Sequence, residues 1–282
     1  MAEENLKKVV QSTPAKVEKA PVAHRAPAYD YGEMKGTGYE GTTNADFAVP
    51  YLSLLQPLSP EVGGQGEDGI IEGAKPGMLL NSVTKQLIDG KKGLIFVPVS
   101  TEHVIVEWRP RESGGGIVAR HTLDSTVWQT AQAHCEFGKY KTAEGNDLVD
   151  TFYLWGYTLD HEDALEPGDA LILTITSTKI KPYRQIMQTL RSFKGKPPLF
   201  ANRLLIKTKQ EKNNKGVFYN YLFAPLRGGV GESLIPPVLE GEPHPLLVFG
   251  KELHEQVQSG LRRAADDSME GKATETSENP PF

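Results

Sequence analysis

Apolar residues between positions 77 and 159 come in short runs separated by turn residues. The runs read GMLLNSV, QLI, GLIFVPV, HVIVEWRP and TFYLWGYTL, and Asp89-Gly90 marks one of the turns. Short apolar runs with turn signals between them are typical of β-strands. Only Ser100 to Glu102 separate GLIFVPV from HVIVEWRP, so these two runs form either an antiparallel hairpin or one bent, continuous strand. The pattern predicts a β-rich domain.

A further strand, ALILTITST, leads directly into a helical pattern. Apolar residues recur there at three- and four-residue spacing, and Pro182 suits the first turn of a helix. The segments RLLIKTKQ and VFYNYLFAP then flank the turn formers Asn213, Asn214 and Gly216, which predicts a second hairpin. A final amphipathic helix is expected from about Leu246 to Ala265.

The ends of the chain have a different composition. Residues 1–45 are rich in Ala, Pro, Lys, Glu, Gly and Thr, and such a segment buries too little apolar surface to offset the entropy of ordering. We expect a disordered arm at 1–45, a nucleic-acid-binding domain at 46–227, a Gly/Pro linker with the C-terminal helix at 228–265, and an acidic disordered tail at 266–282.

The expected fold class is mainly β with a few helices. We expect an elaborated β-barrel of the oligonucleotide-binding (OB) type, enlarged by loops and by a helix between strands, because that fold offers strands and loops to a polyanion. The pattern contains more strands than the five of that fold, so a different β-sandwich stays open.

Composition narrows the class of protein further. The single cysteine, Cys135, excludes an intrachain disulfide and the thiolate clusters of zinc modules. No apolar run reaches the roughly 18 residues that read as a membrane-spanning helix, and the N-terminal residues lack the apolar stretch of a secretory signal. We therefore expect a cytoplasmic protein without membrane contact, in the host cytoplasm if it is phage-encoded. A homo-oligomer stays open.

Charge is strongly segregated along the chain. The formal net charge is -5, but the segment from Lys179 to Lys215 holds eleven basic residues and one acid, Glu211. Downstream, from Ala264 to Phe282, five acids face one base. A strand of phosphates must be met by many cations, so the basic segment predicts contact with nucleic acid. Solvated surface lysines are the alternative interpretation.

Aromatic residues lie among these cations. Single strands expose the faces of their bases, and aromatic rings are sequence-tolerant platforms for them. We expect phosphate contacts or base stacking, without sequence preference and with steep salt dependence, from Trp108, Arg109, Lys179, Lys181, Tyr183, Arg184, Arg191, Lys194, Lys196, Arg203, Lys207, Lys209, Lys212, Lys215, Tyr219 and Tyr221.

The C-terminal residues carry a resemblance. An acidic tail that ends in Pro281-Phe282 resembles the tails of bacterial and phage single-stranded DNA-binding proteins, although Ser277, Glu278 and Asn279 replace the aspartates of the bacterial tip. In those families the tip docks replication and repair proteins and can compete with DNA. The resemblance implies that Pro281 and Phe282 bind replication or recombination proteins.

Three other stretches resemble uncharacterised proteins encoded beside phage replication genes. They read NADFAVPYLSLLQPLSPEV, IIEGAKPGMLLNSVT and EKNNKGVFYNY, and the likeness covers about residues 44–225. It implies a phage replication context without naming an activity.

Catalytic motifs are sparse. The chain contains no GxxxxGK[ST] phosphate loop, and its histidines lack the spacing of metal ligands. We expect no enzyme activity, cofactor or metal. Two alternatives stay open: a phage structural or protein-interaction protein, and a metal-dependent nuclease that would use acids such as Asp68 and Glu72 with Lys75.

Overall fold

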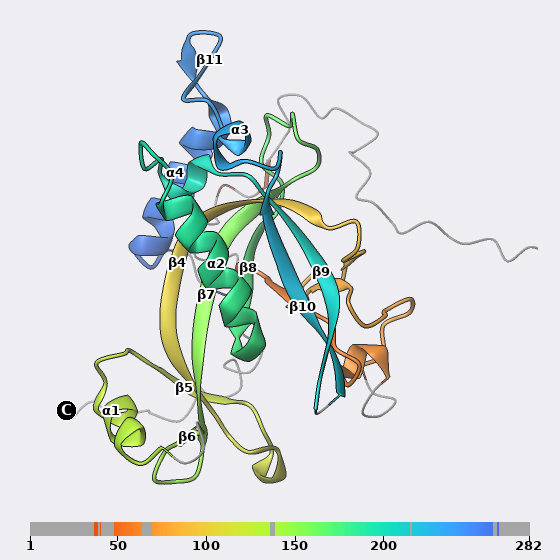
Figure 1. Cartoon of the computed structure of the whole chain (residues 1–282), viewed down its shortest axis with the longest axis vertical. Coiled ribbons are helices and arrows are strands. Elements are labelled where there is room, and N and C mark those ends of the chain that lie inside the picture. Colours follow the sequence, from red (N-terminus) through yellow and green to blue (C-terminus); the bar gives the residue numbers. More distant parts are fainter. Residues whose placement is uncertain are drawn as a thin grey trace, which may run out of the picture. The chain divides into compact units, whose positions relative to one another are not determined.

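The computed structural model describes residues 37–38, 40, 48–63, 69–135, 139–214, 216–261 and 264. Strands predominate in this part of the chain (Figure 1). They are β1 (Tyr51–Leu54), β2 (Leu79–Asn81), β3 (Leu87–Ile88), β4 (Leu94–Trp108), β5 (Ile117–His121), β6 (Tyr140–Lys141), β7 (Asp147–Leu159), β8 (Ala170–Thr176), β9 (Leu204–Asn213), β10 (Gly216–Pro225), β11 (Val238–Leu239) and β12 (Glu242–Pro243). The predicted mainly β class is confirmed.

Helices are few and short. The α-helices are α1 (Thr126–Ala133), α2 (Ile180–Arg191), α3 (Val230–Ser233) and α4 (Pro245–Gln258). Single 3-10 turns are η2 (Pro60–Val62), η3 (Arg111–Ser113), η4 (Ser177–Lys179) and η5 (Leu199–Ala201). The predicted disordered tail, and the predicted arm apart from residues 37, 38 and 40, lie outside the described residues.

One long, curled sheet organises the fold. Its strand order is β10-β9-β4-β7-β8-β1-β2-β3, with β5 added beside β4 and β6 beside β7. All of these pairs are antiparallel except β1 with β8. The register of β4 against β7 shifts between Pro98 and Ser100, which is a β-bulge that bends the strand. GLIFVPV and HVIVEWRP are therefore one bent strand rather than a hairpin.

Hydrogen bonds from side chains connect the two sides of the half-barrel. The amide of Gln56, just beyond β1, pairs like a strand residue with the backbone of Tyr219 on β10: Tyr219 N donates to Oε1 at 2.9 Å, and Nε2 donates to the carbonyl at 3.0 Å. The Tyr221 hydroxyl donates to the carbonyl of Leu52 at 3.3 Å. Polar side chains thus satisfy part of the edge of β10 where no ladder partner exists.

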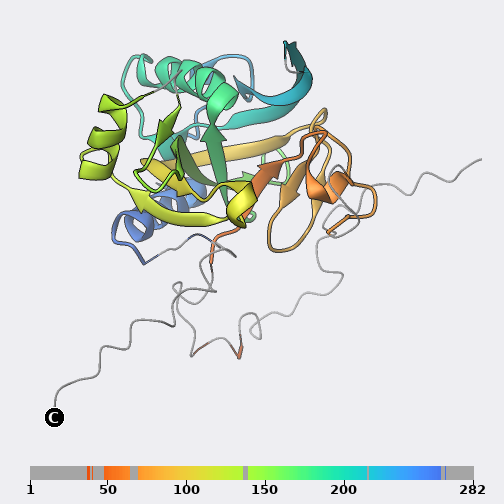
Figure 2. The same cartoon turned by 90° about the horizontal axis from the view of Figure 1, so that it is seen from below.

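The concave side of the sheet holds the largest core cluster. Phe96, Leu154, Leu173 and Ile206 are fully buried there, and α2 covers them. Alternate residues on the same strands face the other way, where Val97 and Tyr157 pack against α4. Figure 2 shows α2 and α4 on opposite sides of the sheet. The helix predicted from Leu246 begins as expected but ends at Gln258, where Gly260, with φ +72°, follows.

A steric reason explains why a glycine, Gly156, occupies the middle of β7. A Cβ atom there would lie 2.2 Å from the carbonyl oxygen of Val97 and 2.4 Å from the ring of Phe96. The glycine in TFYLWGYTL therefore makes room for Phe96 inside the half-barrel.

Candidate nucleic-acid interface

Helix α2 presents a cationic face. Its apolar residues Tyr183, Ile186 and Leu190 are buried against the sheet, while Lys181, Arg184 and Arg191 are exposed among glutamines and threonine. The helix sequence IKPYRQIMQTLR contains no acid. The strong segregation of charged from apolar positions therefore leaves an exposed face with positive charge alone.

The cationic positions continue on β9. Residues directly opposite in an antiparallel pair share a face, so Lys207 with Leu222 and Lys209 with Asn220 lie on the side opposite the buried Ile206 and its partner. Lys209 is exposed, Lys207 is half-buried, and Lys212 is exposed near the tip of the hairpin.

Glu211 lies where the two sets of cations meet. Its Oε1 is 2.7 Å from Lys209 Nζ, and its Oε2 accepts a hydrogen bond of 3.1 Å from Asn220 Nδ2. The hydrogen bonds to Lys209 and Asn220, together with the charges of Lys209 and Lys181, lower the pKa of Glu211. The one acid in this basic segment is thus neutralised by a cation from β9 and influenced by one from α2.

We call the cations of α2, of the segment that follows it and of β9 the cationic surface. Arg191 and Lys196 line one groove beside the C-terminal half of α2, and Gln188 links it to a second groove that contains Lys181 and Arg184. The cationic surface consists of Lys181, Arg184, Arg191, Lys194, Lys196, Lys207, Lys209 and Lys212.

A cluster that the sequence analysis missed borders this surface. His103 on β4 stacks on Phe152 of β7 with ring centroids 3.9 Å apart, and His103 Nε2 lies 2.5 Å from Asp150 Oδ1. Arg184 is 5.4 Å above the Phe152 ring and 3.9 Å from Asp150 Oδ2. The ladder of β4 with β7 could have revealed it, since His103 and Phe152 are direct partners.

The predicted role in base stacking is wrong for two residues, Tyr183 and Tyr221. Tyr183 is 5% exposed and Tyr221 is 1% exposed, and both belong to the concave core. A ring needs an open face to stack on a base. Tyr183 lies on the apolar side of α2, and the inward side of β10 contains Tyr221, so neither ring is a platform for bases.

The other predicted aromatics lie apart from one another. Tyr219 is half-buried and its ring lies over Gly77, where an added Cβ would come within 2.4 Å of a ring carbon. Trp108 is 40% exposed at the last position of β4, and Arg109 is half-buried beside it. β9 pairs with the opposite end of β4, so the strand ladder does not bring Trp108 to the hairpin.

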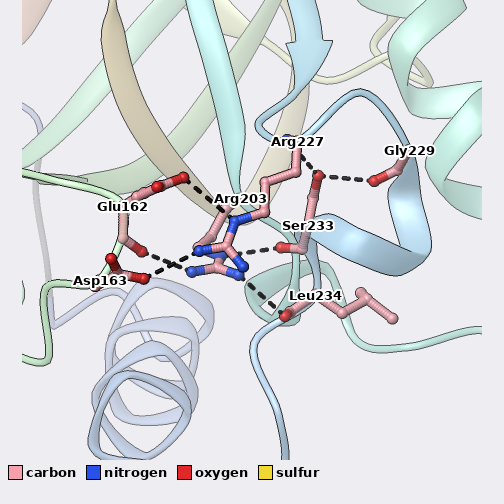
Figure 3. Close-up of polar contacts among 7 residues, drawn as sticks. All are labelled: Glu162, Asp163, Arg203, Arg227, Gly229, Ser233 and Leu234. Carbon is pink, nitrogen blue, oxygen red and sulfur yellow. Dashed lines mark hydrogen bonds and ion pairs between the residues drawn. The ribbon is translucent and has the colours of Figure 1, made fainter.

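Arg203 is corrected as well, because it is buried and bonded to the backbone (Figure 3). Its guanidinium donates to the carbonyls of Ser233 at 3.1 Å, Glu162 at 2.7 Å and Leu234 at 3.3 Å. A nearby, exposed Arg227 makes ion pairs with Glu162 and Asp163. Arg203 therefore fastens two segments, one at Glu162 and one at Ser233 and Leu234, to the start of β9, and its buried guanidinium is used for these backbone contacts.

His244, buried near Arg203, should make stability depend on pH. Its Nδ1 accepts the amide hydrogen of Leu246 at 3.3 Å and so caps α4. Burial, and secondly the charge of Arg203, lower its pKa below the usual 6.5. The unfolded chain therefore binds a proton first as the pH falls, and stability is lost from about pH 6.5 down to the folded pKa.

We expect the melting temperature to drop less between pH 7.5 and 5.5 in His244→Asn, which keeps a capping oxygen. An equal drop in both proteins would contradict this role.

Three predicted site residues, Lys215, Pro281 and Phe282, lie outside the described residues. Within the described ranges, no group of three or more His, Cys, Asp or Glu side chains is arranged to hold a metal ion. In the same part of the chain, no helix has both the length and the apolar composition to cross a membrane.

These features define a mainly β protein with a curled half-barrel and a cationic surface formed by the exposed face of α2, the segment after it and the outer face of β9. The family profile described as Pam3 phage gp34-like protein matches residues 16–262, so the chain belongs to this family. This agrees with the phage context that the sequence resemblance implied. No curated protein and no solved structure matches the chain.

Proposed function

We propose that this protein binds single-stranded DNA without sequence preference and supports phage DNA replication or recombination. The observation that carries the proposal is that cations of α2 and β9 lie close together around Glu211. The charge of Glu211 is already neutralised by its ion pair with Lys209. Among the described residues of this surface, Glu211 is paired with Lys209 and the neighbouring Asp150 lies 3.9 Å from Arg184, so cations predominate, which suits a line of phosphates. Binding is non-catalytic in this proposal and needs no cofactor or metal.

The strand order supports the same proposal. The elements β4, β7, β8, α2, β9 and β10 occur in this order along the chain, with β5, α1 and β6 between β4 and β7, and five of them lie side by side as β10-β9-β4-β7-β8. This order resembles that of an OB barrel, with α2 in the place of the helix between its third and fourth strands. OB proteins bind oligonucleotides on the face of their second and third strands.

That face is covered in this protein. Tyr153 and Trp155 of β7 and Ile172 of β8 are buried there beneath Val257 and Ala264. We therefore place the DNA elsewhere, over the exposed face of α2 and over the outer face of the β9–β10 hairpin, where Lys207 and Lys209 lie. The His103–Phe152 stack borders this path and offers a ring face for a base.

We also propose that the tail after residue 265 binds host or phage replication and recombination proteins, in the cytoplasm of the host. Deletion of Asp266–Phe282 should leave DNA affinity unchanged or raise it, because the deletion removes acids that repel phosphates, while recruitment of those proteins weakens. Anisotropy with labelled oligo-dT and pull-down from phage-infected cells measure the two effects. A deletion that weakened DNA binding would contradict this assignment.

Direct binding tests the main proposal. Fluorescent oligo-dT and a duplex of equal length are titrated at several salt concentrations, with and without magnesium, and the products are inspected for cleavage. We expect tighter binding to oligo-dT, a steep negative dependence on salt and no cleavage. Absence of oligo-dT binding even at low salt would refute the proposal, and magnesium-dependent cleavage would favour a nuclease.

A further inference from the structure

A groove separates η4 from the tip of the β9–β10 hairpin. We call it the η4 groove; it is lined by Gln56, Thr176, Ser177, Thr178, Lys179, Asn213, Gly216, Val217, Phe218 and Tyr219. Two contacts fix the groove's width. Asn220 Nδ2 on β10 donates to the carbonyl of Thr178 at 3.2 Å, and Gln56 pairs with the backbone of Tyr219. The groove is thus built from three segments that lie far apart in the sequence.

Lys179 gives this groove an unmatched positive charge. The side chain is half-buried, and burial alone lowers its pKa. No carboxylate of the described residues forms an ion pair with Lys179, and the contact that is present is with the ring of Tyr221, whose centroid lies 5.9 Å from Nζ. That distance is at the outer limit of a cation–π contact, which is about 6 Å. A desolvated ammonium is unfavourable unless an anion meets it.

The acid of the basic segment, Glu211, does not supply that anion. Glu211 is held by Lys209 and Asn220, and the pKa of Lys179 shows no influence from it. Ser177 and Thr178, both exposed, add hydroxyl groups to the same groove. Hydroxyl and ammonium donors together are suited to the oxygens of a phosphate.

Phe218 provides an apolar wall. It is half-buried and lies on the face of β10 that is shared with Glu211, outside the concave core. Aromatic rings of this kind stack on bases irrespective of sequence. A phosphate donor set and a ring in one groove match the two chemically different parts of a nucleotide.

We propose that the η4 groove holds one nucleotide of a bound single strand, with its phosphate at Lys179 and the hydroxyls of Ser177 and Thr178, and its base against Phe218. This inference rests on the proposed function and goes beyond it, because it names a subsite separate from the exposed cationic surface. Lys179 is then an anchoring residue rather than one more solvated cation.

Lys179→Met tests the phosphate contact, and exposed Lys85→Met is the matched control. We expect Lys179→Met to weaken oligo-dT binding about fivefold at 0.1 M salt and to make the salt slope about 0.7 less steep, as for one lost phosphate contact on a single strand. Because the variant also removes an unpaired, desolvated charge, its melting temperature should be equal to or above that of the natural protein. Lys85→Met should change neither affinity nor slope.

A second measurement follows Lys179 directly. The lysines of the natural protein are acetylated with acetic anhydride under three conditions: with no addition, with oligo-dT, and with inorganic phosphate at the same phosphate concentration. Peptide mass spectrometry then compares the acetylation of Lys179 in the three samples. We expect oligo-dT to protect Lys179 and phosphate to protect it far less. Phe218→Ala should weaken oligo-dT binding about tenfold, the scale of one lost base stack.

The outcomes separate the two proposals. If the natural protein binds no oligo-dT, the proposed function fails. If it binds oligo-dT while Lys179 stays unprotected and Lys179→Met binds normally, the η4 groove is not a subsite and the proposed function stands. Equal protection by inorganic phosphate would reduce the groove to a general anion site, and normal binding by Phe218→Ala would remove the base contact.

Discussion

Replacing Arg203 with methionine should lower the free energy of unfolding by about 3 kcal/mol, the cost typical of breaking a buried charge-assisted network. Methionine has a similar length, but the carbonyls of Glu162, Ser233 and Leu234 lose their donor inside the protein. For a protein of this size, the loss corresponds to a melting temperature lower by about 6–12 °C. Thermal denaturation followed by circular dichroism measures it.

Arg227→Met is the matched control for this variant. Arg227 lies in the same cluster and makes ion pairs with Glu162 and Asp163 (Figure 3). The side chains of these pairs are exposed. Exposed ion pairs contribute about 0–1 kcal/mol, so we expect a shift of no more than a few degrees. If both variants were equally stable, the three backbone contacts would not fasten these loops. Folded Arg203→Met should bind oligo-dT like the natural protein, since Arg203 is not on the cationic surface.

Much of the fold could be predicted because periodicity reports burial. The strand from Leu94, the helix from Ile180 and the hairpin around Asn213 all have apolar residues at the spacing of their element. Helix α1 was missed because it lies in a polar segment: Trp128 and Ala131 alone are buried in it. Its start is set by Ser125, whose hydroxyl accepts the amide hydrogen of Trp128, a signal weaker than periodicity.

The site was less predictable, because a count of charges does not say where each side chain points. Arg203 and Lys209 are six positions apart in one basic segment, yet one is buried among carbonyls and the other is exposed on the cationic surface. Tyr219 and Tyr221 share one face of β10, and that face turned out to be the concave one. Alternation defines two faces of a strand, but only the packing of the whole sheet decides which of them is buried.

Neutralising the α2 face should have the largest effect on DNA binding. In Lys181→Gln/Arg184→Gln/Arg191→Gln, three exposed cations become polar and the buried side of the helix is unchanged. If each meets one phosphate, affinity for oligo-dT at 0.1 M salt should fall about 100-fold, and the slope of log affinity against log salt should become about 2 less steep. Anisotropy titrations at four or more salt concentrations give both quantities.

A second triple variant separates a local contact from the effect of net charge. Lys75→Gln/Lys85→Gln/Lys251→Gln removes the same total charge from exposed lysines outside α2 and the hairpin. If long-range electrostatics alone were responsible, binding would weaken equally in both variants. If α2 contacts phosphates, the control should keep a slope of log affinity against log salt near that of the natural protein, because the control loses no contact that releases counterions. Equal losses would therefore remove α2 from the interface. A loss confined to the α2 variant would assign about three phosphates of the bound strand to this helix.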